Sequence, residues 1–304
     1  MNKEYTRDSS FELLRLILMF LIVFHHAITH GLGLDSFASW SDRKLLINEN
    51  EMNLYLALNN LGIFAVNSFV IISGYFGIRT TKRKSLMLVL GVMFYTLLFS
   101  TIPSIINGNT LLTIKSLLFI SHTSYWFITD YLILMLFAPL INKAYDELKE
   151  RYMKGFSLGV FLIAIYLGFI WGNEIDRSGY NFFHFIVLYA IGRGMSKGWL
   201  HASMHKCMLI FTAAIIGNMI LACVFYTIGQ GDLVWKTTYY SNPLLIVAAT
   251  VMVLAFSQIS FHNRIINYIA SSSLGIYLFQ NTDFVANLFY EKVGTAYVGG
   301  GINH

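Results

Sequence analysis

The sequence predicts an all-α protein, a polytopic bundle of membrane-spanning helices that forms a single domain over residues 1–304. Three observations carry this prediction. Hydrophobic residues make up 56% of the chain and charged residues only 12%, against about 25% charged residues in soluble domains. Only three prolines interrupt it, and proline is the residue that breaks helix interiors. The apolar residues also gather in runs of roughly 17–25 residues, the length that a helix needs to cross a bilayer.

About nine such runs follow one another, near 11–29, 54–76, 86–106, 124–141, 155–172, 181–195, 207–229, 243–260 and 265–290. Residues 111–120 are too short to cross, so we interpret them as a re-entrant or interfacial segment. Polar sequence without a small-residue cleavage site follows the first run, which predicts a retained helix rather than a signal peptide. We find no repeat of fixed period and no soluble domain.

The basic residues of the loops predict the orientation of the bundle, because Lys and Arg are enriched in cytoplasmic loops. Most of the 21 Lys and Arg residues fall on the cytoplasmic side when the N-terminus is placed in the cytoplasm. The net charge of +5 then reflects topology and anionic lipid rather than nucleic acid. The lipid bilayer is therefore an expected partner, and nucleic acid is not.

Arg15 and His26 lie eleven residues apart in the first apolar run. A helix turns about 100° per residue and rises 1.5 Å, so both side chains fall on nearly one face, roughly 16 Å apart. An Arg at the bilayer centre costs roughly 2.5–3.5 kcal/mol on insertion scales, which indicates a functional polar track. Alternatively, Arg15 reaches lipid phosphate and the histidines are interfacial. A metal or haem site at His26 and His30 would lack further ligands.

A basic cluster, Arg79, Lys82, Arg83 and Lys84, follows the second run at the predicted cytoplasmic mouth of the bundle. Four cations within six residues suit the phosphates of a nucleotide-like ligand. The same residues are equally typical of a topology determinant that touches anionic lipid.

Four further polar side chains fall inside predicted spans and are candidates for supporting residues of the functional site: Asn67, Ser73, Trp126 and Asp130. Intramembrane carboxylates are functional candidates by default. A structural role for Asp130, as the partner of an Arg or of a backbone group, is about as well supported.

Several of these residues form spaced motifs. The first run carries Arg15, ten intervening residues and His26, and the second ends in Ser73-Gly74-Tyr75, followed by Arg79-x-x-Lys82. Later matches are Tyr125-Trp126-Phe127 with Ala138-Pro139-Leu140, His184 with Gly192-Arg193, and Ser273 to Leu278. Their order and spacing resemble the integral-membrane acyltransferase family 3, whose bacterial members O-acetylate surface polysaccharides and other envelope acceptors. The resemblance covers most of the chain.

The chain departs from that family at two places. Many relatives carry a histidine at the position that Gln280 occupies here, after Tyr277-Leu-Phe. Relatives also commonly have ten spans, whereas this chain stops soon after the predicted ninth, so it is expected to lack a final C-terminal helix.

The resemblance implies an O-acyltransferase of the bacterial cytoplasmic membrane. It would move an acetyl group from cytosolic acetyl-CoA, a substrate rather than a bound cofactor, to a hydroxyl of a cell-envelope or lipid-linked glycan. In this hypothesis His26 is the base or the transient acyl carrier, and the acyl arm passes Arg15. Arg79, Lys82 and Arg83 hold the phosphates of the donor, and Asn67, Ser73 or Trp126 stabilises the oxyanion. No metal is implied.

Two other functions stay open from the sequence. A multi-pass transporter or flippase of an envelope precursor would also need a polar track, and usually shows internal repeats or broken helices in matching halves. A non-catalytic scaffold in envelope assembly would fit the short C-terminus. Transfer of acetyl groups by the purified protein separates the enzyme from both.

Overall fold

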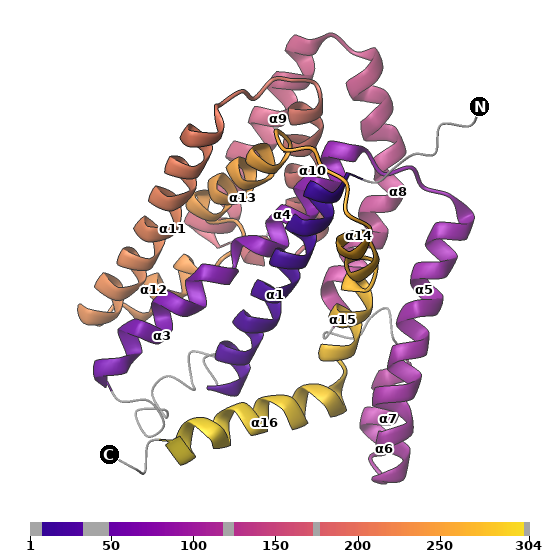
Figure 1. Ribbon diagram of the computed structural model, residues 1–304, viewed down its shortest axis with the longest axis vertical. Helices are drawn as coiled ribbons and strands as arrows, with labels where there is room; N and C mark the ends of the chain where they lie inside the picture. The colour runs from indigo at the N-terminus through magenta and orange to yellow at the C-terminus, as the bar shows by residue number, and fades with distance from the viewer. Residues whose placement is uncertain (1–7, 33–48, 118–124, 173–176, 301–304) are drawn as a thin grey trace.

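The computed structural model describes residues 8–32, 49–117, 125–172 and 177–300 (Figure 1), and these form helices without any strand. In order they are α1 (Ser9–Gly31), α3 (Glu49–Gly62), α4 (Phe64–Phe76), α5 (Lys82–Thr96), η2 (Leu97–Thr101), α6 (Ile102–Ile106), α7 (Thr110–Leu117), α8 (Trp126–Glu147), α9 (Glu150–Ala164), η4 (Ile165–Trp171), η5 (Arg177–Gly179), α10 (Phe182–Ser196), α11 (Met204–Thr227), α12 (Gly231–Thr237), α13 (Pro243–Phe256), α14 (Arg264–Ala270), α15 (Ser273–Gln280) and α16 (Asp283–Gly300).

Six helices in the described part of the chain are long and apolar enough to cross a membrane: Ser9–Gly31, Glu51–Phe76, Lys82–Ile106, Trp126–Glu147, Glu150–Trp171 and Met204–Thr227. Helices α10 and α13 are apolar but shorter. Each of the first eight predicted runs therefore contains an apolar helix. The segment expected to be re-entrant lies partly in α7, and its last residues fall outside the described ranges.

The ninth predicted run is not one helix. The structure divides residues 264–300 into α14, α15 and α16, with turns at 271–272 and 281–282. In a continuing helix, the carbonyls of Tyr268 and Phe279 would accept backbone hydrogen bonds. Here they accept hydrogen bonds from side chains at the turns, from Ser271 Oγ and Thr282 Oγ1 respectively. As a result α16 crosses one end of the bundle (bottom of Figure 1), where Gly31 at the end of α1 packs against Val293.

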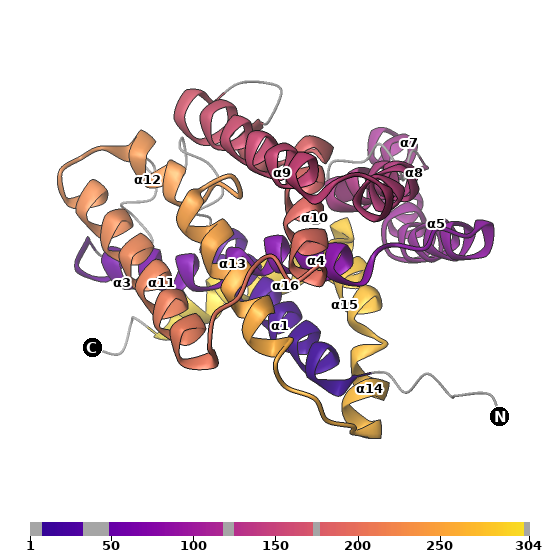
Figure 2. The same cartoon turned by 90° about the horizontal axis from the view of Figure 1, so that it is seen from above.

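Helix α4 forms the centre of the bundle. It is apolar all round, as a buried helix is, and packs against α10, α13 and α1. Figure 2 shows these four helices in the middle, with α3, α11 and α12 on one side and α5 and α8 on the other. Helices α4 and α10 approach closely because Gly74 lies against the Tyr189 backbone and Gly192 against Ile71 O. Small residues allow such close contact between membrane helices.

A ladder of asparagines ties α12 to the bundle. Asn218 of α11 donates to Asn60 Oδ1 at 2.8 Å and to Thr237 O at 2.9 Å. Its own Oδ1 accepts from Asn242 Nδ2 at 2.8 Å. All three asparagines are buried, so the ladder satisfies polar groups that would otherwise be costly in an apolar interior.

We expect Asn218→Leu to destabilise the protein, because it leaves Asn60 Oδ1 of α3 without its donor. It also leaves Thr237 O and Asn242 Nδ2 with only their longer contact of 3.2 Å and, for Asn242, Lys236 O. Each orphaned buried group costs about 1–3 kcal/mol. Thermal unfolding in detergent measures the loss. The control is Gly217→Ala, whose added Cβ would meet nothing within 4 Å; equal melting temperatures for the two variants would refute the role of the ladder.

Candidate active site

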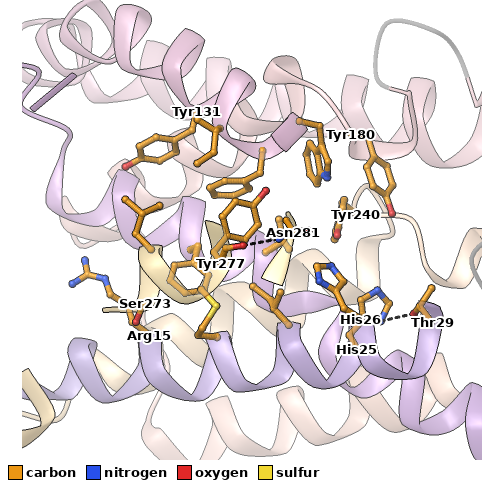
Figure 3. A pocket seen from close by; sticks show the side chains of 18 of the residues that line it. Arg15, His25, His26, Thr29, Tyr131, Tyr180, Tyr240, Ser273, Tyr277 and Asn281 are labelled. Atoms are coloured by element: carbon orange, nitrogen blue, oxygen red, sulfur yellow. Dashed lines mark hydrogen bonds between the residues drawn. The ribbon is translucent and has the colours of Figure 1, made fainter. Parts of the chain in front are cut away.

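One cavity of about 1000 Å³ runs along α1 between this helix and α4, α8, α15 and α16. Arg15 and His26 both line it, as do Trp126 of α8 and Tyr277 of α15. Figure 3 shows Arg15 and His26 toward opposite ends of the same stretch of α1. Arg15 and His26, the two polar residues that are costly in a membrane helix, therefore line one shared cavity.

The Arg15 end of the cavity is polar and internally paired. Arg15 Nη1 donates to Glu12 Oε1 at 2.6 Å, and Glu12 is only 6% exposed. The Arg15 guanidinium also lies 5.9 Å from the centre of the Phe76 ring, in cation–π range. Ser73 and Tyr131 share a hydrogen bond of 3.1 Å on the wall nearby. Arg15 is thus held in place while part of its side chain stays accessible.

His25 and His26 differ in their surroundings although both line the cavity. His25 Nδ1 shares a hydrogen bond of 3.4 Å with Thr29 Oγ1, which in turn donates to Asn59 Oδ1 of α3 at 2.7 Å. Among the described residues, His26 Nδ1 is buried without a hydrogen bond. His25 is therefore linked to α3 through Thr29, whereas His26 is not.

An aromatic wall made of Trp126, Tyr180 and Tyr240 faces this part of the cavity. The ring centroids lie 4.9 Å apart for Trp126 and Tyr180, 5.6 Å for Trp126 and Tyr240, and 4.6 Å for Tyr180 and Tyr240. Burial raises the pKa of Tyr240 well above its ordinary value, so its phenol stays protonated. Figure 3 shows Tyr180 and Tyr240 across the cavity from His26.

Asn67 lies behind the wall of the cavity. It does not line the cavity, because its amide is used behind the wall: Nδ2 donates to Tyr240 O at 2.9 Å, and Oδ1 lies 3.2 Å from His184 Nε2. Both residues are fully buried. Asn67 therefore holds the backbone that carries Tyr240 and is itself shielded from the cavity.

The remaining candidates divide between the cavity and the surface. Ser73 and Trp126 line the cavity. Asp130 does not line it and is half-buried on α8. The three cations Arg79, Lys82 and Arg83 are exposed at the start of α5, where Thr81 caps the helix by accepting from Lys84 N. No group of three or more His, Cys, Asp or Glu side chains in the described ranges is arranged to hold a metal ion.

Sequence reasoning did not find the residues that complete this cavity. Tyr180 and Tyr240 come from the segments just before α10 and α13, and nothing in the local pattern relates them to α1. The sequence indicates the position of Tyr131 only weakly. It lies one helical turn after Phe127, which places both on the same face of α8. Only the packing of α10 and α13 against α4, and of α8 against α10, brings these rings together.

The comparisons with known proteins identify one family. A family model described as an acyltransferase domain matches residues 8–297. No curated protein and no solved structure matches the chain significantly.

Proposed function

Because the chain belongs to acyltransferase family 3, we propose that it is a membrane O-acetyltransferase. In this proposal it moves an acetyl group from cytosolic acetyl-CoA to a hydroxyl of a cell-envelope or lipid-linked glycan. It would act in the bacterial cytoplasmic membrane with its N-terminus in the cytoplasm. The observation that carries the proposal is the single cavity that joins Arg15 and His26 on one wall.

The donor would enter at the Arg15 end. Arg15 lies against Phe76, the last residue of α4, and the chain reaches Arg79 three residues later. Arg79, Lys82 and Arg83 are exposed and form no ion pair within the described residues. Their position at the N-terminus of α5 adds the positive end of the helix dipole, which favours phosphate. These features support a cytoplasmic clamp for the phosphates of the donor, with the thioester arm passing Arg15.

The reaction would take place at His26. The acceptor oxygen attacks the thioester carbonyl carbon while His26 removes the hydroxyl proton, and the C–S bond then breaks as the thiolate takes up that proton. In the second route His26 first carries the acyl group and then passes it to the acceptor. In both routes the indole N–H of Trp126 is the better placed oxyanion donor, because Ser73 Oγ already donates to Phe69 O.

The direct test uses purified protein in detergent or nanodiscs with acetyl-CoA labelled in the acetyl group. We expect protein-dependent release of coenzyme A, and transfer of label to a glycan or lipid-linked sugar fraction of the envelope. A transporter or scaffold would release no coenzyme A, so absence of both release and transfer would overturn the proposal.

We expect the double variant Arg79→Ala, Lys82→Ala to raise the apparent KM for acetyl-CoA about 10-fold or more. Each phosphate contact of an Arg or Lys is a charge-assisted hydrogen bond, worth about 1.5–3 kcal/mol. The dependence of the initial rate on acceptor concentration should change little. Initial rates at varied acetyl-CoA concentration measure the effect.

The control removes two exposed cations elsewhere, Lys149→Ala with Lys206→Ala, both predicted on the cytoplasmic side. This variant also loses two positive charges, but its KM for acetyl-CoA should equal that of the wild type. If the two double variants behave alike, the cluster near α5 serves topology and not donor binding.

A further inference from the structure

Gln280 is buried beside His26. No hydrogen bond among the described residues explains why a polar side chain lies there. It is the last residue of α15, a helix that packs on α1. Its side chain lies next to the His26 imidazole. Yet Gln280 is 8% exposed, and neither of its amide atoms forms a hydrogen bond within the described part of the chain.

One ring nitrogen of His26 is also buried and unpaired. Within the described ranges its Nδ1 forms no hydrogen bond, while the imidazole lines the cavity. His26 Nδ1 and both amide atoms of Gln280 are thus buried without a hydrogen bond among the described residues, although buried polar groups are normally hydrogen-bonded. Ser73, Asn67 and His25, by contrast, are each engaged with defined partners.

Gln280 does not itself line the cavity, whereas Tyr277 and Asn281 on either side of it do. It therefore touches the reacting space only through His26. An amide in this position can accept a proton from Nδ1–H with its oxygen, or donate one to Nδ1 with its nitrogen. The two arrangements place the lone pair of the imidazole on opposite sides of the ring.

We propose that Gln280 is a positioning residue for His26, whose amide oxygen accepts the Nδ1–H and leaves the Nε2 lone pair open to the cavity. This inference rests on the proposed function, since only a base or nucleophile needs that lone pair. When the acceptor hydroxyl gives its proton to Nε2, the imidazolium keeps Nδ1–H bonded to the Gln280 oxygen. The proton leaves Nε2 with the departing thiolate, so the tautomer is restored after each turnover.

The kinetic test compares Gln280→Leu with Gln280→Glu. Leucine keeps most of the volume but accepts no hydrogen bond, so we expect kcat to fall about 10- to 100-fold, the usual effect of losing a group that orients a functional histidine. The KM values for donor and acceptor should stay within about 2-fold, because Gln280 does not line the cavity. Glutamate keeps an acceptor oxygen and should restore kcat to within about 10-fold of the wild type.

Gln258→Leu is the control, because the Gln258 side-chain amide donates to Leu254 O and Cys207 Sγ at the end of α13, away from the cavity. It should retain wild-type kcat. Equal kcat values for Gln280→Leu and the wild type would overturn the inference. A change of Gln280→Leu in KM alone, with kcat unchanged, would also overturn the inference. So would a loss of kcat that Gln280→Glu fails to restore.

A second measurement does not depend on activity. Histidine labelled with ¹⁵N, with the His26 signals assigned by their loss in His26→Asn, reports the tautomer. We expect an unprotonated Nε2 in the wild type and in Gln280→Glu, and a mixture of tautomers in Gln280→Leu. An unchanged tautomer in Gln280→Leu overturns the inference. Absence of acetyl transfer by the wild type would instead overturn the proposed function.

Discussion

His26→Ala is expected to abolish acetyl transfer, with a loss of at least the 10²–10⁴-fold that a general base typically contributes. If His26 carries the acyl group covalently, no transfer through that route remains. The protein itself should accumulate normally in the membrane, because the His26 side chain faces a cavity. Apart from the proposed contact with Gln280, its removal breaks no hydrogen bond among the described residues.

The measurement is coenzyme A release and acyl transfer per mole of membrane protein, with the amount of each variant determined separately. His205→Ala is the control, because His205 is exposed at the start of α11 and does not line the cavity. It should match the wild type. Transfer near the wild-type level in His26→Ala would exclude His26 as base and as acyl carrier.

Gly192→Ala is expected to give the largest loss of stability among single substitutions in the helix core. The added Cβ would lie 2.2 Å from Ile71 O and 2.7 Å from Tyr75 N. Both atoms belong to the backbone of α4, so a rotamer change cannot relieve the clash, and the two helices must separate. Overpacking of this kind costs about 1–3 kcal/mol or more, and each kcal/mol lowers the melting temperature by roughly 2–4 °C in a protein of this size class.

Gly155→Ala provides the matched control on α9, where the new Cβ would meet nothing within 4 Å. Alanine is favoured over glycine in a helix by about 1 kcal/mol, so this variant should melt at or above the wild-type temperature. Thermal unfolding in the same detergent compares the two. If both alanine variants melt together, the close approach of α4 and α10 does not limit stability.

The family and the helical class were predictable because they depend on local sequence. Apolar runs, scarce charge and few prolines indicate membrane helices without reference to any other part of the chain. The ordered motifs gave the family, which the match to residues 8–297 confirms. The breaks at 271–272 and 281–282 were missed because the apolar content of residues 265–290 outweighed the polar turn residues.

The candidate site was predictable only where it lies on one helix. The spacing of Arg15 and His26 is sufficient to place both on one face, because helical periodicity is a local property. The position of Asn67 was not predictable, since its partners lie at residues 184 and 240. The same holds for Gln280, which appears in the sequence merely as the substitute for a histidine found in relatives.

The sequence by itself determined that this protein is a bundle of membrane helices from acyltransferase family 3, with a polar track along its first helix. Tertiary structure alone decided what surrounds that track. The packing of α8 on α10 and the segments before α10 and α13 form the cavity and its aromatic wall, and the packing of α15 on α1 brings Gln280 to His26. The physical reason is that periodicity acts within a helix, whereas the pairing of buried polar groups depends on contacts between residues more than a hundred positions apart.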